Sequence, residues 1–230
     1  MSTEAFPNAP KFGERTLEDF KSRLRGGGAR PNLFECVIDF PDLLLQKEKS
    51  IDKGVREDMR FMVKAANLPA SNVNVIDVPF RGRNLKVAGD RTFDVWTITV
   101  INDVDFRIRT SFEKWMNMIN KHDDNSGITN PVQYQTDAYV YQLGRNGGVD
   151  GIGQKKSNSE KMPVLKGYRF YGVFPTNVSS IELSYDQADT IEEFTVDLQV
   201  QWWDALDSGG ASQLGTGEEG IKAGNNDFGG

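Results

Sequence analysis

The sequence of 230 residues has one cysteine, Cys36, and one histidine, His122. A single cysteine excludes a disulfide within the chain, and a zinc site of thiolates and imidazoles needs several such side chains. Ser-His-Asp or Cys-His catalysis would have to depend on His122 alone. That residue lies in KHDDNSG, which indicates a helix end and a polar turn, so we interpret it as a solvated side chain. We therefore expect neither an enzyme nor a cofactor.

Long hydrophobic runs are also missing. No stretch approaches the ~20 apolar residues that cross a bilayer. The first residues, MSTEAFPNAPKFGERT, lack the basic and then apolar pattern of a signal peptide. We therefore expect that the protein is made in a cytoplasm and that it does not insert into a membrane.

A basic face is not evident either. The net charge is −6 and the isoelectric point is about 5.0, whereas proteins that grip nucleic acid carry clustered Lys and Arg. The composition therefore argues against tight DNA binding, although DNA could still pass the protein without adhering to it.

The residues that are present predict a β-rich chain. Alternating or strand-sized apolar segments predict strands at Asn32–Phe40, Arg60–Asn67, Asn72–Phe80, Asn84–Ala88, Phe93–Ile101, Gln133–Leu143, Val164–Val173 and Ile191–Trp203. Pro69 separates the second strand from the third, and a turn is expected at Ala88-Gly89-Asp90. Apolar residues at helical spacing predict one amphipathic helix over Val104–Lys121. Asp103 and Asp105 fit the start of this helix better than a calcium loop.

The fold class expected is α+β and mainly β: an antiparallel sandwich or barrel with one flanking helix. Residues 1–28 form an N-terminal extension in which Thr16–Arg25 predicts a short helix that ends at three glycines. Residues 29–204 form the β domain, and 205–230 a Gly-rich flexible tail. In the 41–58 segment, charged Gln46–Asp58 is expected as a loop or a short solvated helix on an exposed rim. The composition of Gly144–Glu160 predicts a loop.

Two surfaces are candidates for function. Arg81 and Arg83 flank Gly82 at a hairpin tip, with Arg91 beyond; they suit nucleic acid or, in this acidic chain, a salt bridge to a neighbouring subunit. In the last strand, Phe194, Val196, Leu198, Val200 and Trp202 share an apolar face, and Thr195, Asp197, Gln199 and Gln201 a polar one. The pairs Asp123-Asp124, Glu192-Glu193 and Glu218-Glu219 are interpreted as solvated charge.

Three motifs carry a resemblance to a known family. They are ARPNLF at Ala29–Phe34, AGDRTFDVWTITVIND from Ala88, and FPTNV at Phe174–Val178 before the last β segment. In this order, and over roughly residues 29 to 203, the chain resembles the tail-tube protein of T4-like contractile-tailed bacteriophages. A related baseplate or tube-initiator protein, or a secretion-system tube protein, remains the alternative. A ligand-binding β-barrel would need convergent polar groups, and none is evident.

The resemblance implies six-fold rings that stack into a hollow tube inside a sheath, and strands shared in a ring-wide barrel. It implies as partners further copies of the chain, the sheath protein, tape-measure and baseplate proteins, and DNA in transit without specific binding. The location implied is the virion tail tube, assembled in the host cytoplasm. The matching residues, expected to fix turns and subunit contacts, are Arg30, Pro31, Asn32, Ala88, Gly89, Asp90, Arg91, Trp96, Pro175 and Asn177. Gly89 is expected at a positive φ or a close backbone approach, Asp90 and Arg91 as partners in a turn or in an interface ion pair, and Thr195, Asp197, Gln199 and Gln201 toward the lumen.

Overall fold

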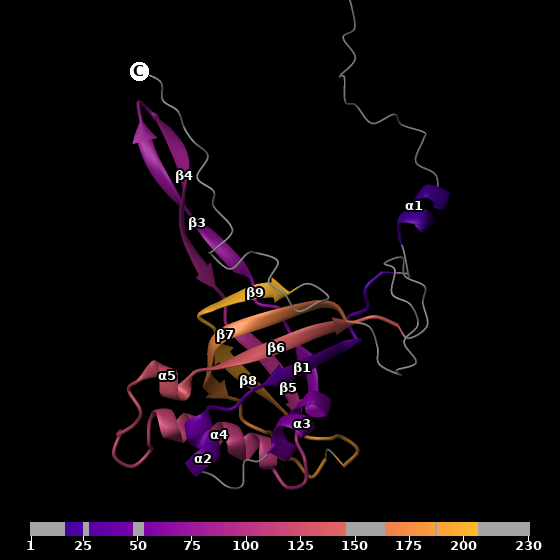
Figure 1. The fold of residues 1–230 in the computed structure, drawn as a ribbon, viewed down its shortest axis with the longest axis vertical. Helices are drawn as coiled ribbons and strands as arrows, with labels where there is room; N and C mark the ends of the chain where they lie inside the picture. Colours follow the sequence, from indigo (N-terminus) through magenta and orange to yellow (C-terminus); the bar gives the residue numbers. More distant parts are fainter. Residues whose placement is uncertain (1–16, 25–27, 48–52, 146–163, 187, 207–230) are drawn as a thin grey trace, which may run out of the picture.

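The computed structural model describes residues 17–24, 28–47, 53–145, 164–186 and 188–206 (Figure 1). The chain is mainly β, with helices α2 to α5 gathered at one end of the strands. In chain order the elements are α1 (Leu17–Arg23), β1 (Phe34–Ile38), α2 (Asp42–Lys47), α3 (Lys53–Met62), β2 (Val63–Ala66), β3 (Ser71–Phe80), β4 (Arg83–Phe93), β5 (Trp96–Ile101), α4 (Arg107–Ile119), α5 (Pro131–Tyr134), β6 (Thr136–Leu143), β7 (Val164–Val178), β8 (Glu193–Gln199) and β9 (Trp202–Leu206).

Two antiparallel sheets share strand β7. Sheet A contains β1, β6, the first part of β7 and β9, and sheet B contains the end of β7 followed by β8, β5 and β2. Inside β7 the register against β6 shifts between the pairs of Phe170 and Val173, and Gly172 between them has φ 62°. A glycine at positive φ is the usual means of bulging and bending a strand. The bend lets one strand serve two sheets, and the predicted antiparallel, mainly β class is confirmed.

The core lies between the two sheets and under the helices. Trp96 of sheet B stacks on Phe170 of sheet A with ring centroids 4.5 Å apart. On β5 and β8 the predicted apolar faces are buried: Ile98 pairs with Val196, and both are fully inaccessible. The two-residue period of these strands therefore places one face in the core and leaves the other polar.

Helix α4 covers the end of the sandwich. Its residues Ile108, Phe112 and Trp115 are fully buried, as the helical spacing predicts. The carboxylate of Asp103 accepts a hydrogen bond from the backbone N–H of Arg107 at 3.1 Å, which satisfies one free donor of the first turn. The interpretation of Asp103 as a helix-start residue is confirmed.

The 41–58 segment differs from its prediction. It contains α2 and the start of α3, and on α3 the side chains of Val55 and Met59 are fully buried in the core. Residues four apart lie on one face of a helix, so this short helix adds to the core instead of standing in solvent. Its charged face pairs with β1 and the residue after it: Arg60 contacts Glu35 of β1, and Arg56 contacts Asp39 at 2.7 Å. The many charged residues of α3 made its two buried apolar positions hard to recognise in the sequence.

The expected turn at Ala88-Gly89-Asp90 is wrong, because β4 continues through these residues. The register against β3 shifts between Val73 and Val75, which places a bulge beside Gly89. Gly89 is not among the residues at positive φ. A Cβ there would lie 3.1 Å from the carbonyl oxygen of Asn74, so the close-approach alternative accounts for this glycine.

Other boundaries also move. The strand predicted at Phe93–Ile101 breaks at Asp94-Val95, the one predicted at Ile191–Trp203 breaks after Gln199, and Arg60–Met62 belong to α3. Phe174–Val178 lies inside β7. The predictions for residues 1–16, 146–163 and 207–230 lie outside the described residues. No helix in the described ranges combines the length and the apolar character needed to cross a membrane.

Candidate functional site

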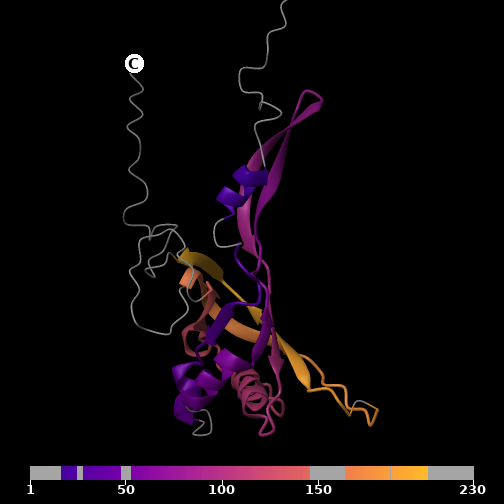
Figure 2. The same cartoon turned by 90° about the vertical axis from the view of Figure 1, so that its right-hand side faces the viewer.

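Strands β3 and β4 form a separate two-stranded sheet that projects from the sandwich (Figures 1 and 2). With 10 and 11 residues, its strands reach about 33 Å at the usual rise of a β-strand. Its large apolar side chains are 43% to 65% exposed, and they are Val73, Val75, Ile76, Val78, Phe80, Leu85 and Val87. An isolated hairpin is marginally stable in water, so an apolar one of this length calls for a partner.

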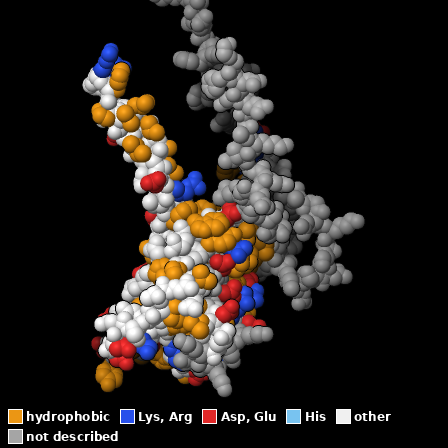
Figure 3. Space-filling model, turned by 60° about the vertical axis from the view of Figure 1, so that its left-hand side comes forward, with side chains coloured by type: hydrophobic (Ala, Val, Ile, Leu, Met, Phe, Trp, Pro, Cys, Tyr) orange, Lys and Arg blue, Asp and Glu red, His pale blue; other side chains and the backbone are white. Residues whose placement is uncertain are grey.

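The tip of the hairpin is basic. Arg81 and Gly82 both have positive φ, 47° and 82°, as the type I′ turn that suits two-residue hairpins requires. The guanidinium of Arg81 lies 5.2 Å from the ring centre of Phe80, and Arg83 pairs with Phe80 across the turn. Figure 3 shows this arrangement as a hydrophobic shaft with a basic end. Arg81 and Arg83 therefore lie at a hairpin tip, where the sequence places them.

Asp90 and Arg91 lie near the base of the hairpin and not in a turn. Neighbouring residues of a strand point to opposite faces, so these two side chains are not placed to pair with each other. The cross-strand ion pair that holds the shaft joins Lys86 to Asp77 at 3.1 Å. At the base, the ring of Phe93 packs edge-on against Trp203 of β9.

The second candidate surface is the polar face of sheet B. Thr195, Asp197 and Gln199 are partly exposed on β8, opposite the core. Asp197 accepts hydrogen bonds from Asn177 on β7 at 3.0 Å and from Thr97 on β5 at 2.7 Å. These two bonds, that from Asn177 first, hold the pKa of the Asp197 carboxyl below its usual value. The structure thus joins two of the predicted site residues and adds Thr97, which alternation along β5 placed on the same face.

The remaining predicted residues are dispersed. Arg30 and Asn32 lie in the turn before β1, where the carbonyl of Arg30 accepts from the N–H of Leu33 at 3.1 Å. Trp96 and Pro175 are buried. Gln201 lies in the break between β8 and β9, where its N–H donates to the carbonyl of Tyr171. It does not continue the polar row of β8, and Trp202, predicted on the apolar face, is 45% exposed.

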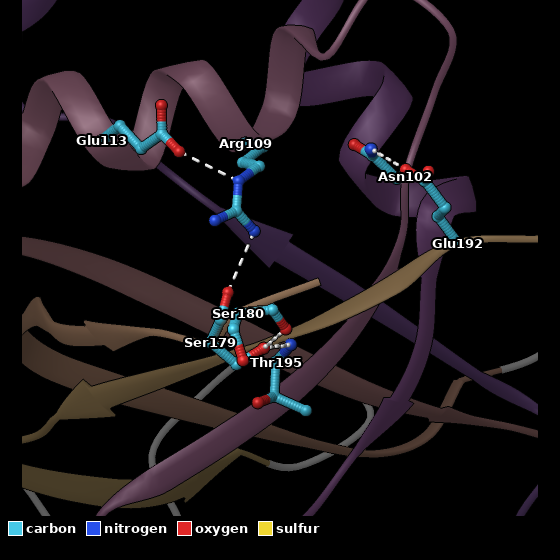
Figure 4. A network of polar contacts seen from close by, with 7 residues as sticks. All are labelled: Asn102, Arg109, Glu113, Ser179, Ser180, Glu192 and Thr195. Carbon is cyan, nitrogen blue, oxygen red and sulfur yellow. Dashed lines mark hydrogen bonds and ion pairs between the residues drawn. The ribbon is translucent and has the colours of Figure 1, made fainter. Parts of the chain in front are cut away.

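A polar network ties α4 to sheet B (Figure 4). Arg109 donates to the carbonyl oxygen of Ser179 at 3.0 Å and to Glu113 at 2.9 Å. The hydroxyl of Ser179 in turn accepts from the N–H of Thr195 at 2.8 Å. Through Ser179, α4 is thereby linked to β8 at Thr195, the first residue of the polar face.

Of the carboxylate pair interpreted as solvated charge, Glu193 is exposed and Glu192 partly exposed, and both side chains also have structural partners. Glu193 pairs with Lys64 on β2 at 2.5 Å, and Glu192 accepts from Asn102 at 3.0 Å. Both contacts tie the start of β8 to its neighbours. Among the described residues, no three His, Cys, Asp or Glu side chains are grouped to hold a metal.

Comparison with known proteins assigns the chain to a family. Residues 29–205 match the phage tail tube protein family. The chain belongs to that family. It is 31% identical over 179 residues to the tail tube protein gp19 of Enterobacteria phage T4, covering 78% of this chain and 93% of that protein. It is 28% identical over 186 residues to the tail tube protein of Serratia phage KSP90, covering 80% and 93%.

A solved structure shows the same fold. A chain in the six-fold symmetrised baseplate of the anti-feeding prophage aligns with a TM-score of 0.51 at 10% identity, covering 79% of this chain and 97% of that one. In this member of the tail tube family, two features have no evident role in the fold of a single copy: the exposed apolar hairpin and the polar face of sheet B.

Proposed function

We propose that the protein is the structural subunit of the inner tail tube of a contractile bacteriophage tail, without enzymatic activity. The observation that carries the proposal is the projecting hairpin with seven exposed large apolar side chains, in a chain of the tail tube family. Exposed apolar surface and free strand edges invite association. Assembly with further copies would cover the surface and pair the edges.

The assembly proposed is a six-fold ring. Sheet B supplies four strands, β7, β8, β5 and β2, and six copies would supply 24. At ~4.8 Å between strands and ~40° tilt, such a barrel has a backbone diameter of about 48 Å. Side chains narrow the passage but leave room for a DNA duplex. Strands that border a subunit would pair with those of the next, so that the closed ring leaves no lateral edge.

The polar face of sheet B would line this passage. Thr195, Asp197 and Gln199 present hydroxyl, carboxylate and amide groups, and Asp197 is held ionised by its hydrogen bonds. Neutral and acidic groups do not release counterions from DNA. The genome could therefore slide through the tube during ejection without being held.

The other partners follow from this placement. A tube of stacked rings would meet the sheath protein on its outside, the tape-measure protein inside and the baseplate at its end, all within the virion tail. Assembly would take place in the host cytoplasm.

Sedimentation velocity of the full-length protein and of a hairpin-shortened variant tests the proposal. Val75 and Ala88 pair across the hairpin, so replacing Ile76–Val87 with Asn-Gly leaves a two-residue turn between paired residues. None of the removed side chains is buried, so the sandwich should still fold. The expected result is polymers for the full chain and monomers for the variant. Isolated rings from the full chain would favour a baseplate or initiator component, and stable monomers would overturn the proposal.

A further inference from the structure

Helix α1 carries an exposed apolar stripe. Its large apolar side chains, Leu17 and Phe20, and Leu24 directly after it are 46% to 66% exposed, and no residue of α1 is buried. Positions three, four and seven residues apart lie on one face of a helix, so the three side chains form a single stripe. A helix of seven residues is marginal in water by itself. It therefore needs a surface on which to pack.

The family match does not account for α1. The helix precedes residues 29–205, the range that matches the tail tube family. Its acidic residues, Glu18 and Asp19, lie in the first turn, and Lys21 and Arg23 lie in the last. The apolar stripe is thus an addition of this chain to the shared fold, and it has a defined polarity of charge along its length.

One face of the β3–β4 hairpin is apolar over most of its length. Residues that pair across two strands present their side chains on the same face, and Val78 pairs with Leu85 and Ile76 with Val87. Alternation along β3 adds Phe80 to this face, whereas the opposite face carries the cross-strand ion pair of the hairpin. A two-stranded sheet becomes stable when a helix covers its apolar face.

The two apolar surfaces match in length. The hairpin face extends about 13 Å from Ile76 to Phe80 at the rise of a strand. The stripe of α1 extends about 10 Å from Leu17 to Leu24 at the rise of a helix. One short helix laid along the hairpin therefore covers most of the exposed face.

The charges at one end of each surface match as well. The basic last turn of α1 is the end nearer the sandwich (Figure 1). Asp90 is exposed near the base of the hairpin, also close to the sandwich. A helix that lies alongside the hairpin in this orientation brings Lys21 and Arg23 toward a carboxylate.

In a single copy these surfaces lie on opposite flanks. Figure 1 shows the hairpin rising from one flank of the sandwich and α1 above the other, and Figure 2 shows them at the same height. The two sheets lie one behind the other in Figure 1. In a ring whose passage faces sheet B, neighbours therefore stand side by side in that view, with α1 of one copy next to the hairpin of the other.

We propose that α1 of one copy packs its apolar stripe along the hairpin of the neighbouring copy in the same ring. Phe20 covers the pair of Val78 and Leu85, and the basic last turn of α1 faces Asp90. The two surfaces differ, so the contact is heterologous, and six of them close a ring. The inference rests on the proposed tube function, since it concerns how the subunits of one ring are joined.

Disulfide trapping in assembled full-length protein tests the contact. On oxidation, the variant carrying both Phe20→Cys and Leu85→Cys should give a ladder of covalent multimers that ends at six copies. Native Cys36 is buried with a pKa raised to about 12, so it stays unreactive. Each single variant has one reactive thiol and should give dimers at most. Phe20→Cys with Asn84→Cys is the matched control, because Asn84 points to the opposite face of the hairpin, and it should give little ladder.

The products of the oxidation distinguish the other arrangements. Monomers with an internal cross-link would mean that α1 covers the hairpin of its own chain, and a ladder beyond six copies would mean a contact between rings. Either result, or polymers without cross-links, would overturn the inference and leave the tube function intact. Absence of polymers from the wild-type chain would overturn both.

Replacement of single residues on α1 gives a second readout. Phe20→Ser removes the largest apolar side chain of the stripe and should raise the concentration needed for assembly about tenfold or more. Glu18→Ser changes a residue on the other side of the helix and should have little effect. Assembly of Phe20→Ser at the wild-type concentration would contradict the packing of α1 on a neighbour.

Discussion

The side-chain amide of Asn177 on β7 donates a hydrogen bond to the carboxylate of Asp197 on β8 at 3.0 Å. The hydroxyl of Thr97 on β5 donates a second bond to the same carboxylate. Three strands are thus joined by one ionised group on the face opposite the core. This carboxylate links the stability of the sheet to pH.

The Asp197→Asn substitution should remove that linkage. The folded-state pKa of Asp197 lies below its unfolded value, ~3.9, so its contribution is present above that value and is lost as pH falls through the folded pKa. The group is partly exposed, so solvent screens it and the contribution should stay below about 1 kcal/mol. Urea unfolding, under conditions that keep both proteins monomeric, should give a higher free energy of unfolding for wild type than for Asp197→Asn at pH 6. The difference should disappear below about pH 4. A difference that stays constant with pH would contradict this account.

Substitution of Trp96 should separate packing from hydrogen bonding. Trp96 is fully buried against Phe170, and its indole N–H has no hydrogen-bond partner in the described structure. Trp96→Ala should cost about 3–5 kcal/mol of unfolding free energy. Trp96→Phe keeps an aromatic ring and removes a buried, unpaired donor, so it should cost less than half as much. Chemical denaturation measures both, and similar losses for the two variants would show that the indole N–H is satisfied.

Arg109 should be a structural anchor of the helix layer. It bonds the carbonyl of Ser179, and its guanidinium lies 5.3 Å from the ring centre of Phe194. Arg109→Ala should lower the unfolding free energy by about 1–3 kcal/mol. Glu113→Gln removes only the exposed charge four residues along the helix and should cost about 0.5 kcal/mol or less. Thermal melts that rank the two variants in the opposite order would refute this role.

The thiol of Cys36 should be unreactive in the folded protein. Burial, and to a lesser degree the charge of Glu35, raises its pKa to about 12, and only the thiolate attacks disulfides and alkylating reagents. Titration with a thiol reagent at pH 8 should give almost no reaction in native buffer and one thiol per chain in denaturant. Rapid reaction in native buffer would mean that β1 opens readily.

The sequence predicts most of the sandwich because alternation exposes which face of a strand is buried. Strands β5 and β8 and helix α4 follow from their periodicity, and the family follows from three local motifs. The two-residue period does not show where a strand ends, however. The glycine at position 89 therefore suggested a turn, whereas the structure has one long strand with a bulge opposite it. In α3, two buried positions among many charges give too weak a signal to mark a core helix.

The candidate surfaces were predictable only in part. The hairpin tip follows from Arg-Gly-Arg between strands, and the polar face from alternation along β8. Partners from distant segments, such as Lys64 for Glu193, depend on strand order, which local patterns do not determine.

A cryo-EM map of the polymers formed by the purified full-length protein tests the central claim most directly. The account predicts a hollow cylinder of stacked six-fold rings. Its inner wall should be a continuous barrel of hydrogen-bonded strands that cross subunit boundaries, with Asp197 facing the passage. A map in which each subunit keeps its sheets closed and touches its neighbours only through side chains would contradict it.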